Sequence, residues 1–83
     1  MKNSDSFLKN LSVTVRNHRK KGGLNQQKLA KLAGVGKSAV FDLEHEKKTI
    51  QLDTLLKILY VLNISMTLSS PLMKSVSPKD ESK

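Results

Sequence analysis

The 83-residue sequence contains no cysteine and no tryptophan, and its aromatic residues are two phenylalanines and one tyrosine. Without cysteine, the chain has neither a disulfide framework nor a thiolate metal site, a composition that suits a reducing cytoplasm. Its length is enough for one domain with a small core and short tails, but not for an enzyme-sized active-site cleft. We therefore expect a cytoplasmic protein that is not an enzyme.

Long apolar runs are also missing. The longest, around residues 55–62, is interrupted by Lys57 and is far shorter than the roughly 20 residues that cross a bilayer. The N-terminal sequence MKNSDSFLKNLS lacks the apolar centre of a secretion signal. Residues 34–37, GVGK, lack the full spacing of a phosphate-binding loop, and no Ser, His and Asp set stands in a plausible order for catalysis.

Acidic residues are scarce, with seven against 15 lysines and arginines, and the net charge is +8. Residues 9–48 contain ten lysines and arginines against three acids, a difference of +7. Such a concentration predicts a polyanionic partner. A membrane surface fits less well than nucleic acid because no segment combines a basic face with a bulky aromatic face.

The chain is organised around residues 26–43, QQKLAKLAGVGKSAVFDL. Apolar residues recur at helical spacing on both sides of Gly34, which can adopt the positive φ that a β-carbon penalises. Ala30 is small where the second helix would cross, and Val35 would plug the turn. The pattern indicates a helix-turn-helix.

The second helix of this motif is expected over about residues 36–45, with Val40 and Leu43 against the core. Gly36 caps a helix start less well than Ser or Thr, so we expect a looser start. The opposite, solvent-facing side carries Lys37, Ser38, Phe41, Asp42 and His45. Such a helix fits the major groove of B-DNA. A purely structural helical hairpin is the alternative, and the polar outer face and local positive charge favour DNA.

A first helix is expected after Ser4 or Asp5, either of which can cap it, and it should end at Gly22 or Gly23. His18 falls on its apolar stripe. Because no second ligand stands at metal-binding spacing, we expect a partly buried, hydrogen-bonded core histidine and no metal or other cofactor. His45 is expected to be a solvated residue at a helix end.

Phosphate contacts are expected at two places. Asn25 can cap the second helix of the chain, which places Gln26 and Gln27 in its first turn, where amide groups and free N–H groups can hold a phosphate. Ordinary capping is the alternative, and both can hold together. Lys47 and Lys48 lie in the loop after the helix expected over residues 36–45. They can touch phosphates there, or they form a solvated charge run.

A fourth helix from about Gln51 to Asn63 has more apolar surface than one side of a small bundle needs, which predicts a subunit interface. Residues 64–68 alternate apolar and polar, the period of a strand, and we expect this strand to pair with its copy across a dimer. An extended tail lying on its own domain is the alternative. The predicted dimer contacts are Leu59, Tyr60, Ile64, Met66 and Leu68. Residues 1–4 and 69–83 are expected to be flexible.

Over residues 11–68 the sequence resembles the Xre/Cro-type helix-turn-helix repressors of bacteria and phages, through Arg19, LNQQKLAKLAGVGKSAVFDLE from Leu24 to Glu44, and LDTLLKILYVLNIS. The resemblance implies an all-α, compact, four- to five-helix domain of the lambda-repressor type over residues 5–68. Within that family, LNISMTL is similar to the same segment of HipB-like antitoxins, the DNA-binding partners of HipA-like serine/threonine kinase toxins.

The resemblance also implies roles for individual residues. Gln26 matches a glutamine that holds a phosphate and sometimes a base, and Arg19 and Glu44 match a semi-buried ion pair. The positions that read base edges are Lys37, Ser38, Phe41 and Asp42. Gly36 departs from the usual capping residue, and Phe41 with Asp42 is an unusual reading face. By chemistry, lysine donates to guanine, phenylalanine meets a thymine methyl, and aspartate accepts from cytosine or repels phosphate.

The sequence thus predicts a homodimeric, nucleoid-associated repressor of its own operon that binds palindromic double-stranded DNA and a HipA-like kinase. A stand-alone Xre-type regulator with no toxin partner is the first alternative. A pure interaction protein, whose basic helices dock an acidic partner, is the second.

Overall fold

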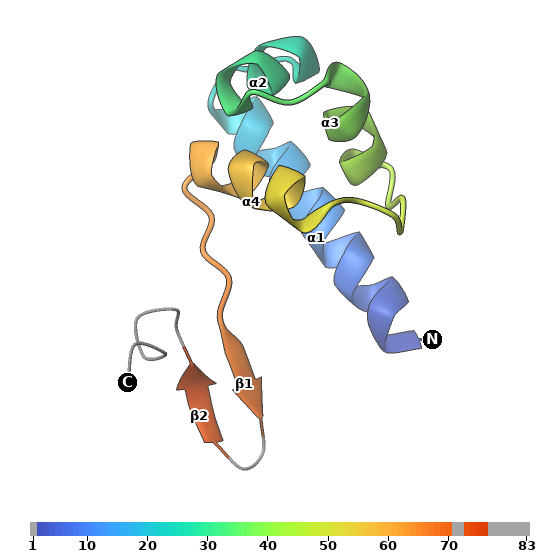
Figure 1. Cartoon of the computed structure of the whole chain (residues 1–83), viewed down its shortest axis with the longest axis vertical. Helices are drawn as coiled ribbons and strands as arrows, with labels where there is room; N and C mark the ends of the chain where they lie inside the picture. The colour runs from blue at the N-terminus through green and yellow to red at the C-terminus, as the bar shows by residue number, and fades with distance from the viewer. Residues whose placement is uncertain (1, 71–72, 77–83) are drawn as a thin grey trace.

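The computed structural model describes the backbone of residues 2–70 and 73–76 and the side chains of residues 5–67. Within these residues the elements are α1 (Lys2–Lys21), α2 (Gln26–Ala33), α3 (Lys37–Glu44), α4 (Leu52–Val61), β1 (Leu68–Ser70) and β2 (Met73–Val76). The four helices pack together, with the long α1 running beneath the other three, and the two strands extend away from them (Figure 1). The predicted all-α helix-turn-helix domain is confirmed, with four helices.

The first helix begins earlier than expected. It starts at Lys2, so Ser4 and Asp5 lie inside α1 rather than at its cap, and the segment expected to be flexible is helical from Lys2 onward. Met1 lies outside the described residues. The negative charge of Asp5 still interacts favourably with the positive pole of the helix dipole, because Asp5 stands in the first turn. The helix ends before Gly23, which has a φ of 72°.

The turn between α2 and α3 follows the sequence pattern. The Asn25 side chain accepts a hydrogen bond of 2.7 Å from the backbone N–H of Lys28 and so caps α2. Gly34 ends α2 with φ 72° and ψ 33°. Gly36 precedes α3 and has no side chain that could cap it. The helices are therefore joined by a tight turn whose geometry depends on one left-handed residue.

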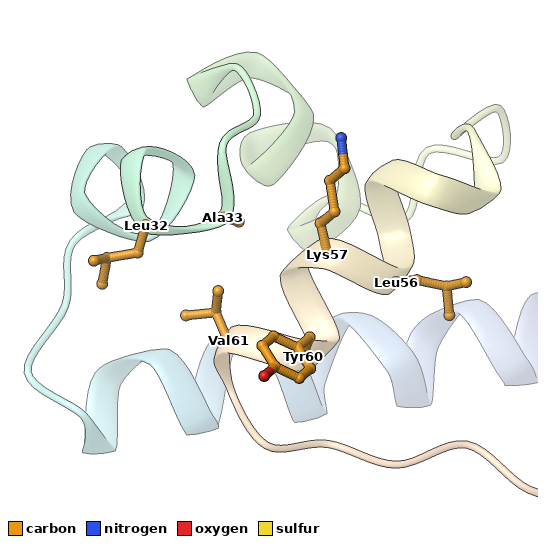
Figure 2. Close-up of a pocket in the computed structure, with 6 residues that line it drawn as sticks. All are labelled: Leu32, Ala33, Leu56, Lys57, Tyr60 and Val61. Carbon is orange, nitrogen blue, oxygen red and sulfur yellow. The ribbon is translucent and has the colours of Figure 1, made fainter.

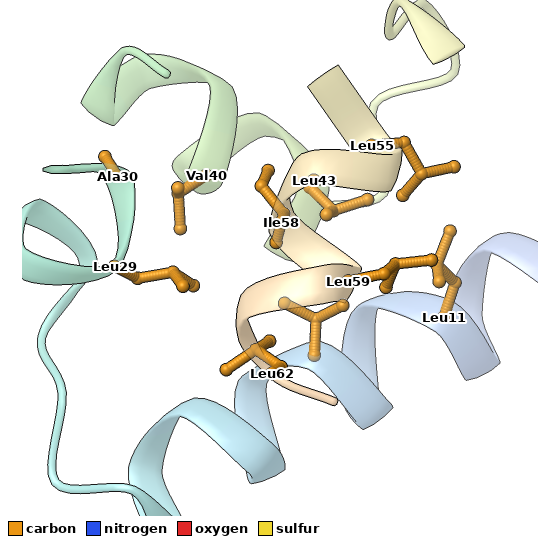
Figure 3. Packing of buried hydrophobic residues seen from close by; sticks show 10 residues of the cluster. Leu11, Leu29, Ala30, Val40, Leu43, Leu55, Ile58, Leu59 and Leu62 are labelled. Carbon is orange, nitrogen blue, oxygen red and sulfur yellow. The ribbon is translucent and has the colours of Figure 1, made fainter. Parts of the chain in front are cut away.

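The core is built from all four helices (Figure 3). Its buried members are Leu11, Val15, Leu29, Ala30, Val40, Leu43, Leu55, Ile58, Leu59 and Leu62. The predicted burial of Ala30, Val40 and Leu43 is confirmed, and the half-buried Val35 packs against the same cluster. Because Val40 and Leu43 lie on one side of α3, the other side faces solvent.

The C-terminal strand prediction was wrong in position. Asn63 ends the fourth helical segment with a φ of 60°, but residues 64–67 form no strand. Strand β1 pairs with β2 of the same chain, antiparallel, with Leu68 opposite Val76 and Ser70 opposite Met73. Ile64 packs against the helical core, whereas the next three residues, Met66 included, are exposed, so the alternation of residue types in this segment does not correspond to an alternation of burial. The expected tail, residues 69–83, contains β1 from its second residue onward and all of β2, and its residues 71–72 and 77–83 lie outside the described residues.

Candidate nucleic-acid interface

The solvent-facing side of α3 gathers the residues that the sequence placed on it. Lys37, Ser38, Phe41 and His45 are exposed and Asp42 is half-buried. Phe41 is the unusual member, with 48% of its surface exposed although it is a large apolar residue. The face combines a cation, an acid, a hydroxyl and an aromatic ring on one helix, which is a set of groups that can contact base edges.

Phe41 and His45 form a stacked pair that the sequence analysis did not predict. Their ring centroids lie 3.9 Å apart with an interplanar angle of 23°. His45 Nδ1 lies 2.8 Å from the backbone oxygen of Phe41. Because a carbonyl oxygen can only accept, Nδ1 is the protonated ring nitrogen and donates a hydrogen bond to this oxygen. The i, i+4 spacing on a helix is the sequence signal that indicates such a pair. The expectation that His45 is a solvated residue at the helix end is confirmed.

A buried ion pair fixes α3 on α1. Arg19 Nε lies 2.6 Å from Glu44 Oε2 and Arg19 Nη2 lies 3.0 Å from Glu44 Oε1, so the guanidinium and carboxylate meet in the two-pronged geometry expected for this pair. Arg19 Nη1 also donates to the backbone oxygen of Leu24 at 2.8 Å. Glu44 is only 2% exposed. One arginine thus holds the end of α3 and the loop before α2 together.

The electrostatics of Glu44 follow from these contacts. Burial raises the pKa of the Glu44 carboxyl, but hydrogen bonds from Arg19 and Gln26 together with the nearby arginine charges hold that pKa below its ordinary value. The hydrogen bond to Glu44 raises the pKa of Arg19. Arg16 adds a second tie, because its Nη2 donates to the Glu44 backbone oxygen at 3.0 Å. A cation at this helix end is favourable to the dipole, and the sequence analysis assigned Arg16 no role.

Gln26 reaches the same carboxylate. Its Nε2 donates to Glu44 Oε1 at 3.1 Å, which leaves one amide N–H and the amide oxygen for other partners. Gln26, Gln27 and Lys37 line an open polar hollow of about 320 Å³ together with Arg19 and Asn25. The structure therefore brings three of the predicted DNA-contacting residues to one place, between the starts of α2 and α3. Their contact with phosphate stays a prediction.

Lys47 and Lys48 lie near acids in this structure. Lys47 Nζ is 3.4 Å from Asp42 Oδ2 and Lys48 Nζ is 3.2 Å from Asp5 Oδ1. Exposed pairs of this kind contribute little to stability, so each lysine can exchange its acid for a phosphate at small cost. The predicted phosphate contacts of the two lysines are compatible with these positions.

His18 was wrongly expected in the core. It is exposed, and its Nδ1 lies 2.8 Å from the backbone oxygen of Thr14. The buried side of α1 instead carries Val15 and Ser12, whose hydroxyl donates to the Lys9 backbone oxygen at 3.0 Å. The histidine is therefore hydrogen-bonded, as expected, but it is not part of the core. Among the described residues, no group of His, Cys, Asp or Glu side chains could hold a metal ion.

The predicted dimer contacts divide into two sets. Tyr60 is 84% exposed and Met66 is exposed, whereas Leu59 lies in the core and Ile64 is half-buried against it. The Leu59 side chain therefore does not present the surface that the sequence predicted. The side chain of Leu68 lies outside the side chains that the structure describes, residues 5–67.

An apolar groove runs between α2 and α4. It encloses about 410 Å³ and is lined by Leu32, Ala33, Leu56, Lys57, Tyr60 and Val61. Figure 2 shows Leu32 of α2 and Val61 of α4 on the two sides of this groove. No helix in the described part of the chain is long and apolar enough to cross a membrane.

These features define a small helix-turn-helix transcriptional regulator with an exposed recognition helix. The chain belongs to the helix-turn-helix family HTH_3, whose model matches residues 15–68. It is 38% identical over 61 residues to the uncharacterised HTH-type transcriptional regulator y4mF of Sinorhizobium fredii, covering 74% of this chain and 80% of that protein. The prediction of an Xre-type DNA-binding regulator is confirmed at this level.

The solved structures similar to this chain include the following two. A chain in the structure of a HipA–HipB–O2–O3 complex superposes with a TM-score of 0.68 at 30% identity, covering 77% of this chain and 90% of that one. The restriction-modification controller protein C.AhdI from Aeromonas hydrophila superposes with a TM-score of 0.64 at 30% identity, covering 72% of this chain and 91% of that one. The likeness thus extends over almost the whole of each regulator.

Proposed function

We propose that this protein is the antitoxin and autorepressor of a HipBA-like toxin–antitoxin operon, acting in the cytoplasm on nucleoid DNA. It binds a palindromic operator as a dimer and forms a complex with a HipA-like serine/threonine kinase. The observation that supports the proposed operator binding is the exposed face of α3, which the Arg19–Glu44 pair fixes on a strongly basic domain. The similarity to a chain of the HipA–HipB–O2–O3 complex and the segment LNISMTL support the antitoxin half.

The α4 side of the apolar groove is the surface proposed for the second copy. Leu52, Leu56 and Tyr60 recur at intervals of four and are all exposed, so they form one apolar row. Asp53 and Lys57 stand beside this row, also four residues apart and exposed. A two-fold axis through the middle of α4 would set the acid of each copy opposite the lysine of the other, which is the self-complementarity that a symmetric dimer requires.

Such a dimer would place two α3 helices in successive major grooves, about 34–36 Å apart. The first experiment therefore measures the affinity of the purified protein for the palindromic DNA upstream of its gene and for a scrambled duplex, at several salt concentrations. We expect preference for the palindrome and an affinity that falls steeply with salt, because lysines and arginines displace counterions. Equal affinity for both duplexes would contradict the repressor assignment.

The kinase partner is tested separately. The protein and the kinase encoded next to it are co-expressed and purified through a tag on the kinase, and the chain truncated after residue 68 is compared with the full chain. The surfaces left free by DNA and by the second copy are the outer side of α1 and the segment after residue 68. Loss of co-purification on truncation would assign the contact to that segment, whereas no co-purification of the full chain would remove the antitoxin half.

A stand-alone regulator is the second candidate function. The similarity to the controller protein C.AhdI at 30% identity favours it, because the same fold there belongs to a restriction-modification controller. The gene neighbourhood discriminates between the two. A whole or split HipA-like kinase in the adjacent reading frame supports the antitoxin, and its absence supports the stand-alone regulator. A pure interaction protein would show no sequence-specific footprint on DNA.

A further inference from the structure

We infer that the stacked Phe41–His45 pair reads the C5-methyl group of a thymine in each operator half-site. In this assignment Phe41 touches the methyl group, and His45 is a positioning residue that holds the Phe41 ring. The inference rests on the proposed DNA binding and names the chemistry that the middle of α3 recognises.

The first step concerns the exposure of Phe41. It leaves 48% of its surface in water on a helix face whose other members are polar or charged. A phenyl ring can neither donate nor accept a hydrogen bond, so a polar base edge placed against it would lose its water without gaining a partner. The apolar group that the major groove offers is the thymine methyl. Burial of that methyl against the ring is therefore the favourable contact.

The second step concerns the position of the ring. A lone phenylalanine on an exposed helix face samples several rotamers, and binding would have to fix one of them. Here the His45 ring stacks on it at 3.9 Å, and His45 Nδ1 donates to the Phe41 backbone oxygen at 2.8 Å. The two rings thus constrain each other before DNA arrives, which lowers the entropy cost of contact.

The third step concerns the support beneath the pair. His45 is the C-terminal cap of α3, and its own N–H contacts the backbone oxygens of Phe41 and Asp42. The preceding residue, Glu44, is held by Arg19 through its carboxylate and by Arg16 through its backbone oxygen. The end of the recognition helix is therefore tied to α1, and the aromatic pair stands on this fixed end.

The test removes one methyl group at a time. A preferred duplex is selected from a randomised library with the wild-type protein, and each thymine of one half-site is then replaced by deoxyuridine, which lacks only the C5-methyl. We expect one thymine whose replacement weakens wild-type binding about fourfold, the value for one buried carbon. Phe41→Ala should bind the methylated and unmethylated duplexes equally.

The role of His45 is tested on the same pair of duplexes. His45→Ala should reduce the methyl effect, and His45→Tyr should restore most of it because a ring remains to stack on Phe41. Lys48→Ala is the matched control, since loss of a phosphate contact weakens binding to both duplexes alike. Circular dichroism should show unchanged helix content in the three variants at the exposed positions 41 and 45.

The outcomes separate the inference from the proposed function. Two outcomes would overturn the inference and leave the repressor assignment standing. In the first, a sequence is enriched but no deoxyuridine replacement changes the affinity of the wild-type protein. In the second, Phe41→Ala still binds the methylated duplex more tightly than the unmethylated one. A full methyl effect in His45→Ala would overturn the positioning role. Failure to enrich any sequence would overturn both the inference and the proposed DNA binding.

Discussion

At the scale of single residues, Arg19 makes three side-chain hydrogen bonds, which join α1 to the end of α3 and to the loop before α2. It joins Glu44 and the Leu24 backbone oxygen, and both ion-pair partners are buried. Arg19→Ala leaves the Glu44 carboxylate buried with its main partner gone, so we expect a loss of about 3–5 kcal/mol in the free energy of unfolding. Thermal unfolding measures this loss. Lys20→Ala, one position along α1 and exposed, is the control, and an unchanged midpoint in Arg19→Ala would contradict the prediction.

The carboxylate of the same pair predicts how stability depends on pH. Because the pKa of Glu44 is lowered in the folded chain, the unfolded chain binds the proton more readily, and stability rises with pH in this range. The contribution is fully present above the ordinary pKa of 4.5 and is lost as the pH falls through the lowered folded value. Urea unfolding across about pH 3 to 7 should show this slope. Glu44→Gln should flatten it, and an equal slope in that variant would assign the effect elsewhere.

Contacts between side chains were the part of the site that the sequence predicted least. The Arg19–Glu44 pair was expected from the family resemblance, whereas the bond from Gln26 to Glu44 and the stack of His45 on Phe41 were not. Both depend on which rotamer each side chain adopts after the helices have packed. His18 was misjudged for a related reason, because its helical spacing from Leu11 and Val15 does not by itself say which side chains become buried when the helices pack.

At the scale of elements, the helix-turn-helix was predictable because its signals are local. Gly34, Asn25 and the spacing of apolar residues define the ends and buried sides of α2 and α3 without knowledge of the rest of the chain. The strands were not predictable in the same way. Residues 69–83 are rich in Ser and Lys, a composition typical of a tail. Pairing between β1 and β2 is a property of two segments rather than of either alone.

The turn itself makes a prediction. Gly34 has a φ of 72°, and a β-carbon there would meet no atom within 4 Å, so the cost of Gly34→Ala comes from the backbone conformation alone. We expect a loss of about 1–2 kcal/mol. Gly36→Ser is the matched control, because Gly36 has a φ of −75° and a serine there can cap α3. Chemical denaturation of both variants checks this, and equal destabilisation of the two would contradict the account of the turn.

At the scale of the whole molecule, the proposed dimer makes a prediction from charge. Asp53→Lys and Lys57→Asp should each weaken self-association roughly two- to fivefold, because like charges would face each other across α4. The double variant should recover the wild-type value. Sedimentation equilibrium measures this, with Asn17→Ala on α1 as the control. Additive losses in the double variant would place the two residues outside a symmetric contact.

One carboxylate connects the folding of this protein with its hold on DNA. Glu44 fastens α1 to α3 and also restrains the amide of Gln26, the side chain expected at a phosphate. A substitution of Gln26 that removes its hydrogen bond to Glu44 should therefore change the stability of the four-helix domain as well as the proposed phosphate contact. If Gln26 contacts a phosphate as proposed, a change at Gln26 should register in a melting curve as well as in a binding isotherm.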